Sequence, residues 1–189
     1  MSFEHPPLPW YDTPTVYGRV SRLLHWGGAL VVLGMLASGL VADKLPEGRL
    51  QYLLGRSHVL LGSLMLLPLL LRVLWRGWNS LRDQTPQPIS SPGWQRLVER
   101  GTHLLLLGLL LAVLLAGPLS IWAEGEPIRL IGSFELGSPI GEHPGLRRLC
   151  HRVHETGAKL LIPLLLMHLA GVLRHGRRAW ERMAGQGRD

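Results

Sequence analysis

The chain has 189 residues, of which 47% are hydrophobic and 17% are charged, and its formal net charge is +7. Long Leu-rich runs alternate with Arg-rich connections, which excludes an ordinary soluble domain and indicates an integral membrane protein. Because the basic residues flank the apolar runs, we attribute the positive charge to membrane topology and anionic lipid, and we exclude nucleic acid as a partner.

Residues 1–18 form a Pro-rich tail without an apolar run, so they do not resemble a signal peptide. Four apolar spans follow, at about 23–41, 57–75, 102–122 and 151–173, and a basic tail covers 176–189. Pro-rich residues 76–100 connect the second and third spans, and a loop of Gly, Pro and Glu over 123–148 precedes the fourth. We therefore predict an all-α integral membrane four-helix bundle within residues 19–175, without an internal repeat.

An even number of spans places both termini on one side of the membrane. Of the 20 Lys and Arg residues, twelve fall on the side of the termini and eight on the opposite side. Cytoplasmic connections carry an excess of Lys and Arg, so we predict that both termini, and the tails 1–18 and 176–189, are cytoplasmic. The opposite side is then periplasmic.

Four histidines fall at two depths of the predicted bundle. His154 and His168 are fourteen positions apart in the fourth span, so they share a helical face and are separated by about 21 Å along the axis. His25 opens the first span at the depth of His168, and His58 opens the second span at the depth of His154. Two pairs at two depths suit two bis-histidine haems stacked across a membrane, a coordination that favours electron transfer over oxygen binding.

Other histidines leave alternatives. His103 opens the third span on the side of the termini and competes with His25 as the partner of His168. His151 precedes His154 by three residues and is interpreted as a neighbour of the haem propionates. His175 is interpreted as a solvated tail residue, with contact to quinone or a proton as the alternative.

Other metal sites fit the sequence less well. Cys150 is the only cysteine, which excludes an intrachain disulfide, a zinc ribbon and an iron–sulfur ligand set, and no Cys-x-x-Cys-His sequence occurs for covalent haem attachment. Copper or zinc could use paired imidazoles, but no carboxylate or thiolate set lies at matching depth. We expect small residues to let a flat macrocycle approach the helices, namely Gly27, Gly28, Gly55, Gly62, Gly157 and Gly171.

The chain resembles the bacterial cytochrome b561 family, four-helix di-haem b cytochromes of the inner membrane, over about residues 17–175. The resemblance is carried by YGRVSRLLHW at 17–26, by HVLLG from 58 with Arg72 after it, and by His154-Glu155 with His168 fourteen residues later. The third span, with His103 and Gly117-Pro118, departs from the family pattern.

This resemblance implies that His25 and His168 bind one haem b, and that His58 and His154 bind the other. It also implies an inner-membrane location and ubiquinone as the electron acceptor. Pro163 lies between the two ligands of the fourth span, where a kink would change the separation of the haems.

Basic residues gather in sequence around His58 and His154, and we call them the basic collar: Arg56, Arg147, Arg148, Arg152 and Lys159. Propionate neutralisation and interfacial snorkelling account for such a collar. Alternatively, it steers a small anion to the haem edge. The family resemblance makes superoxide the candidate anion, which implies a superoxide oxidase that passes electrons to ubiquinone, with His175 or Glu155 as candidates for the proton transfer.

A second function belongs to a different class. A haem-bearing membrane anchor subunit would accept electrons from a periplasmic dehydrogenase or hydrogenase partner and pass them to quinone without being an enzyme itself. A haem-free structural or transport protein is a third possibility, and it predicts a colourless purified protein.

Overall fold

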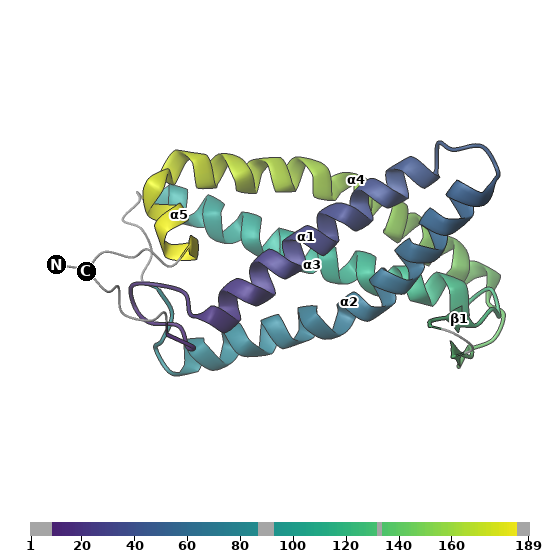
Figure 1. Ribbon diagram of the computed structural model, residues 1–189, viewed down its shortest axis with the longest axis horizontal. Helices are drawn as coiled ribbons and strands as arrows, with labels where there is room; N and C mark the ends of the chain where they lie inside the picture. The colour runs from purple at the N-terminus through teal and green to yellow at the C-terminus, as the bar shows by residue number, and fades with distance from the viewer. Residues whose placement is uncertain (1–8, 87–92, 132–133, 185–189) are drawn as a thin grey trace.

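The computed structural model describes residues 9–86, 93–131 and 134–184. Residues 1–8 and 185–189 of the predicted tails therefore lie outside the described part, as do residues 87–92 of the Pro-rich connection. The described chain contains four long helices arranged as a bundle, which confirms the predicted all-α membrane architecture (Figure 1).

The long helices are α1 (Arg19–Ala42), α2 (Arg49–Leu81), α3 (Gly93–Trp122) and α4 (Pro144–His175), followed by the short α5 (Arg177–Ala184). Each predicted span lies inside one long helix, and all four are long and apolar enough to cross a membrane. The helices extend beyond the spans because a helix satisfies its own backbone hydrogen bonds on either side of the lipid boundary. Pro163 is contained within α4, which continues through it from His154 to His168.

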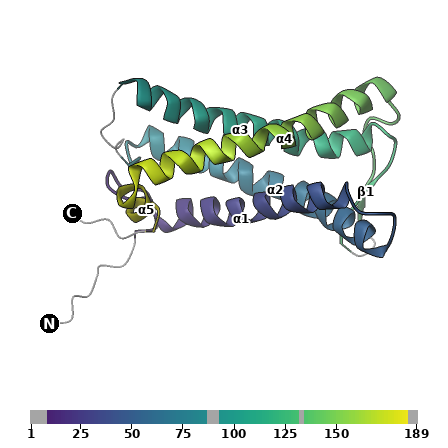
Figure 2. The same cartoon turned by 90° about the horizontal axis from the view of Figure 1, so that it is seen from above.

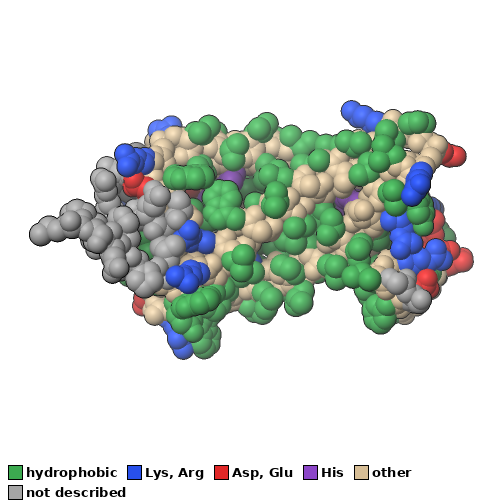
Figure 3. Space-filling view, in the orientation of Figure 1, with side chains coloured by type: hydrophobic (Ala, Val, Ile, Leu, Met, Phe, Trp, Pro, Cys, Tyr) green, Lys and Arg blue, Asp and Glu red, His purple; other side chains and the backbone are tan. Residues whose placement is uncertain are grey.

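The surface of the bundle is apolar along its length and charged at its ends. Large hydrophobic side chains such as Leu30, Leu67, Leu104 and Leu166 are exposed. Figure 3 shows hydrophobic side chains over the middle of the molecule, with Lys, Arg, Asp and Glu gathered toward both ends. This distribution fits a protein whose middle faces lipid and whose ends face water.

The four helices form two helical hairpins. Helix α1 packs against α2, α3 packs against α4, and α2 with α3 joins the two pairs. We call α1 with α2 the first hairpin and α3 with α4 the second hairpin; Figure 2 shows α3 and α4 side by side. Where the hairpins meet, Met35, Met65, Leu69 and Leu114 form a buried cluster.

The two ends of the bundle differ. A two-stranded antiparallel sheet of β1 (Ile128–Arg129) and β2 (Glu135–Leu136) lies in the connection between α3 and α4, which the sequence predicted only as a loop. We call this the β end. The opposite end holds the start of α1, the end of α4 and α5, and we call it the terminal end (Figure 1).

Helix α5 folds back onto the start of α1 at the terminal end. Arg22 Nε and Trp26 Nε1 both donate to the carbonyl of Met183, at 2.8 and 3.4 Å. The rings of Trp26 and Trp180 are in edge contact. Part of the predicted basic tail is therefore a helix packed on the bundle.

Candidate haem-binding sites

At the β end, His58 of α2 faces His154 of α4. Their ring centroids are 5.8 Å apart, and the ring planes are inclined by 87°. Both side chains line a cavity of about 180 Å³ between the hairpins. The first hairpin supplies one imidazole and the second hairpin supplies the other.

Each of these rings is held by its own hairpin. His58 Nδ1 donates to the carbonyl of Met35 on α1 at 3.0 Å, and His154 Nδ1 donates to the carbonyl of Val113 on α3 at 2.9 Å. A carbonyl oxygen only accepts, so both Nδ1 atoms carry the proton and both Nε2 atoms present a lone pair. Imidazoles that ligate metals are typically oriented by such a bond on the other nitrogen.

A glycine of the same hairpin lies against each ring. A Cβ added to Gly39 would lie 3.2 Å from His58 Cε1, and one added to Gly117 would lie 3.2 Å from His154 Cε1 and Nδ1. These two positions therefore leave room for the imidazole rings of His58 and His154. Gly39 was not singled out from the sequence, and Gly117 was noted only as part of the departure from the family pattern, because the role of each depends on which helix packs beside it.

The glycines chosen from the sequence as clearance for a macrocycle differ in their surroundings. Added Cβ atoms at Gly62 and Gly157 would collide with Met35 Cε at 2.9 Å and Val113 Cγ2 at 2.5 Å, so these glycines allow close helix packing. A Cβ at Gly28 would lie 3.3 Å from Met65 Cε, and Gly27, Gly55 and Gly171 have open space.

At the terminal end, His168 of α4 lies near two other imidazoles. The centroid of His25 is 6.3 Å away, with the ring planes inclined by 68°. The centroid of His103 is 5.0 Å away, in an edge contact inclined by 89°. Structure and sequence thus leave the same two partners for His168, one from each hairpin.

The hydrogen bonds at the terminal end favour His103 over His25 as the partner of His168. Arg72 Nη2 lies 2.9 Å from His25 Nδ1 and donates to it, which places the ring proton of His25 on Nε2. His103 Nδ1 donates to the carbonyl of Glu99 at 2.7 Å, so its Nε2 presents a lone pair. Ligation by His25 therefore requires the proton to move to Nδ1 and Arg72 to find another acceptor.

The donor sets can be compared with the needs of a haem. An imidazole nitrogen binds a metal at about 2 Å, so two rings on opposite faces of one iron have centroids about 6 Å apart. His58 with His154 at 5.8 Å and His25 with His168 at 6.3 Å fit this separation, whereas the 5.0 Å between His103 and His168 is shorter. Within the described residues, no three His, Cys, Asp or Glu side chains converge on one metal position. Two imidazoles without further protein ligands suit a macrocycle that supplies its own nitrogens.

The basic collar surrounds the β end, and part of it is charge-compensated. Arg147 Nη2 lies 2.9 Å from Glu124 Oε1, and Lys159 Nζ lies 2.6 Å from Glu155 Oε1. The guanidinium of Arg56 lies over the Tyr52 ring. Arg148 and Arg152 are exposed and form no ion pair with another residue that the structure describes.

A second cavity of about 420 Å³ opens outside the His58–His154 cavity. Its polar lining comes from Gln51, Tyr52, Arg56 and Arg129, and it shares Val59 and Ile121 with the inner cavity. Arg129, which was not part of the predicted collar, donates from Nε to Glu135 Oε1 at 2.9 Å. The collar residue Arg56 thus lines a cavity that shares part of its wall with the His58–His154 cavity.

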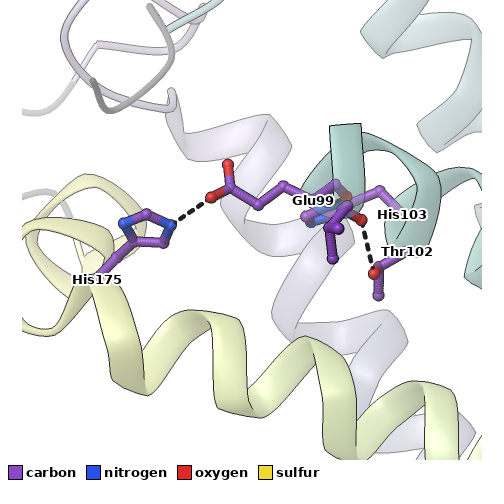
Figure 4. A network of polar contacts seen from close by, with 5 residues as sticks. Glu99, Thr102, His103 and His175 are labelled. Carbon is purple, nitrogen blue, oxygen red and sulfur yellow. Dashed lines mark hydrogen bonds and ion pairs between the residues drawn. The ribbon is translucent and has the colours of Figure 1, made fainter. Parts of the chain in front are cut away.

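A titratable pair links the two helices of the second hairpin at the terminal end. His175 Nε2 lies 2.6 Å from Glu99 Oε1, and their side chains are 17% and 32% exposed (Figure 4). Glu99 was missed in the sequence because its partner is 76 residues away. The other predicted proton carrier, Glu155, is occupied by Lys159, and His151 is exposed on α4.

Two comparisons with known proteins identify the family of this chain. The family model described as prokaryotic cytochrome b561 matches residues 16–186. Cytochrome b561 homolog 2 of Escherichia coli (strain K12) is 32% identical over 178 residues, which cover 89% of this chain and 88% of that relative.

Proposed function

Since this chain belongs to the prokaryotic cytochrome b561 family of electron-transfer proteins in the bacterial inner membrane, we propose that it holds two haem b groups and conducts single electrons between them. The observation that carries the proposal is the arrangement of His58 with His154 and of His25 with His168. Each pair joins the two hairpins at one depth of the bundle, at a separation that suits one iron.

When bound, haem supplies one-electron redox chemistry, and the chain holds and orients it. His58 and His154 would ligate through Nε2, since their Nδ1 protons are engaged by backbone carbonyls. His25 and His168 would ligate the second group. A propionate at the terminal end would give Arg72 the anionic acceptor it needs when it leaves His25 Nδ1.

The substrate at the β end is proposed to be superoxide. Each superoxide gives up one electron and leaves as dioxygen, so this half-reaction needs no proton and no open iron position. Arg56, Arg148 and Arg152 are the exposed collar residues whose charge is not paired with a described carboxylate, and they would raise the local concentration of the anion.

The electron acceptor is proposed to be ubiquinone at the terminal end, which we place on the cytoplasmic side. Reduction of the quinone to its quinol consumes two electrons, from two superoxides, and two protons. Glu99 and His175 form a partly buried ion pair at the terminal end, where His175 follows His168 by seven residues in α4. We propose them as the proton carriers.

The proposal is tested by haem content followed by stopped-flow reduction. The purified protein should contain two haem b groups per chain, and superoxide should reduce the oxidised protein on mixing. One haem per chain would refute the two-site arrangement. If superoxide fails and a periplasmic dehydrogenase or hydrogenase reduces the protein instead, the chain is a membrane anchor subunit.

A further inference from the structure

The two hairpins hold the β-end imidazoles of His58 and His154 with the same arrangement of a backbone carbonyl and a glycine. In the first hairpin the acceptor carbonyl is Met35 and the glycine against the ring is Gly39, four residues later; in the second they are Val113 and Gly117, again four residues apart. The local sequences are MLASG and VLLAG.

The correspondence extends beyond these two segments. His25 precedes Met35 by ten residues, and His103 precedes Val113 by ten. Arg72 follows His58 by fourteen residues, as His168 follows His154. The contacts of these residues also correspond between the hairpins. Arg72 donates to His25 in the first hairpin, and the ring of His168 is in edge contact with the ring of His103 in the second. The two hairpins therefore correspond at these positions, although no internal repeat was predicted from the sequence. A difference between them beside the β-end rings points to the side chain at that position.

One such difference lies beside the ligand rings. Position 38 is Ser, whereas the equivalent position 116 is a buried Ala. Ser38 Oγ lies 3.2 Å from His58 Nδ1 and donates to the carbonyl of Met35 at 2.9 Å. With its hydrogen directed at that carbonyl, the hydroxyl oxygen faces the Nδ1 proton of His58 as a second acceptor. For His154 Nδ1, the acceptor found among the described residues is the carbonyl of Val113.

We propose that Ser38 is a positioning residue that makes His58 the more electron-donating of the two β-end ligands and so lowers the reduction potential of the haem held there. Acceptors at the Nδ1 proton of a ligating imidazole raise its basicity, and a more basic ligand stabilises the oxidised metal. This inference rests on the proposed function, since it requires a haem between His58 and His154.

A lowered potential at the β end has a direct use. In the proposed direction of transfer, electrons enter near the basic collar and leave at the terminal end. By lowering the potential of the β-end haem, Ser38 would make the step from that haem to the terminal-end haem more favourable.

The test is a redox titration of the haem-loaded protein with Ser38→Ala, Ala116→Ser and Ser63→Ala. Ser38→Ala should raise the potential of one haem by about 30 mV, an approximately threefold change in its reduction equilibrium constant, and leave the other unchanged. Ala116→Ser should lower that same potential. Ser63→Ala is the matched control, because Ser63 lines the cavity but donates to Val59 of its own helix.

Two additions keep the result unambiguous. His58→Ala should remove the haem whose potential responds to Ser38, which identifies it as the β-end group, and Ser38→Thr should restore the original potential by restoring the hydroxyl. Unchanged potentials in Ser38→Ala and Ala116→Ser, with two haems bound, would overturn the role of Ser38 alone. Absence of a β-end haem in the unaltered protein would overturn the proposed function.

Discussion

His25 and His168 belong to different helical hairpins, yet their ring centroids lie 6.3 Å apart at one depth of the bundle. The same holds for His58 and His154 at the other depth. In the proposed arrangement, each haem would bridge the first hairpin to α4 of the second hairpin. Binding of haem and assembly of the bundle should be coupled.

This coupling predicts that removal of haem lowers the stability of the protein. A ligand that binds only the folded state stabilises it by an amount that grows with its concentration relative to its dissociation constant, about 2.7 kcal/mol at a hundredfold excess. We expect haem-depleted protein in detergent to unfold at a lower temperature than the loaded protein. Equal unfolding temperatures, with haem content verified by absorbance, would show that the hairpins associate independently of the cofactor.

The choice between His25 and His103 is decided by haem content. His168→Ala should lose one of two haems, because no other described imidazole replaces it on α4 at that depth. His25→Ala should lose the same haem, and His103→Ala should keep both, since the 5.0 Å between His103 and His168 is shorter than the separation that suits one iron. Loss of haem in His103→Ala with retention in His25→Ala would transfer the ligand role to His103.

Bulk at Gly117 should disturb the β-end site. A Cβ there would lie 3.2 Å from the His154 ring, so Gly117→Val should turn or displace the ligand and reduce haem content or alter the absorption spectrum. The matched control is Gly108→Val in the same helix, where an added Cβ meets nothing within 4 Å. If both variants keep the unaltered spectrum, the space beside His154 is not needed for ligation.

Charge pairing divides the basic collar into two groups. Arg148→Gln with Arg152→Gln should slow reduction by superoxide several-fold at low salt, and the loss should shrink as salt screens the attraction. Arg147→Gln should have a smaller effect because Glu124 already compensates that charge. A rate that is the same in all these variants would leave the collar with a structural role only.

The Glu99–His175 pair should matter for quinone and not for the reaction with superoxide. Glu99→Gln and His175→Gln should slow quinone reduction by the pre-reduced protein while leaving haem content and reduction by superoxide unchanged. Glu181→Gln is the control, because Glu181 forms a comparable ion pair with Arg177 on α5. Equal quinone rates in all three variants would exclude the pair as proton carriers.

Helix number, span limits and the depth of each histidine could be predicted from the sequence alone. The length of an apolar run and the rise of a helix are local properties, so His154 and His168 could be placed on one face and at two depths before any contact was known. The family resemblance had the same basis, in short segments of the first, second and fourth spans, and the comparisons confirmed it.

Only the tertiary structure decided what each side chain contacts. Which helix lies beside which determines the carbonyls of Met35 and Val113 that accept from the β-end imidazoles, the arginine at His25 Nδ1 and the glycines against the rings. Likewise, the ion pair that compensates Arg147 comes from a partner distant in sequence. Periodicity places a side chain on a face of its own helix, whereas the packing of helices determines its neighbour, and that neighbour sets the proton position and the available charge.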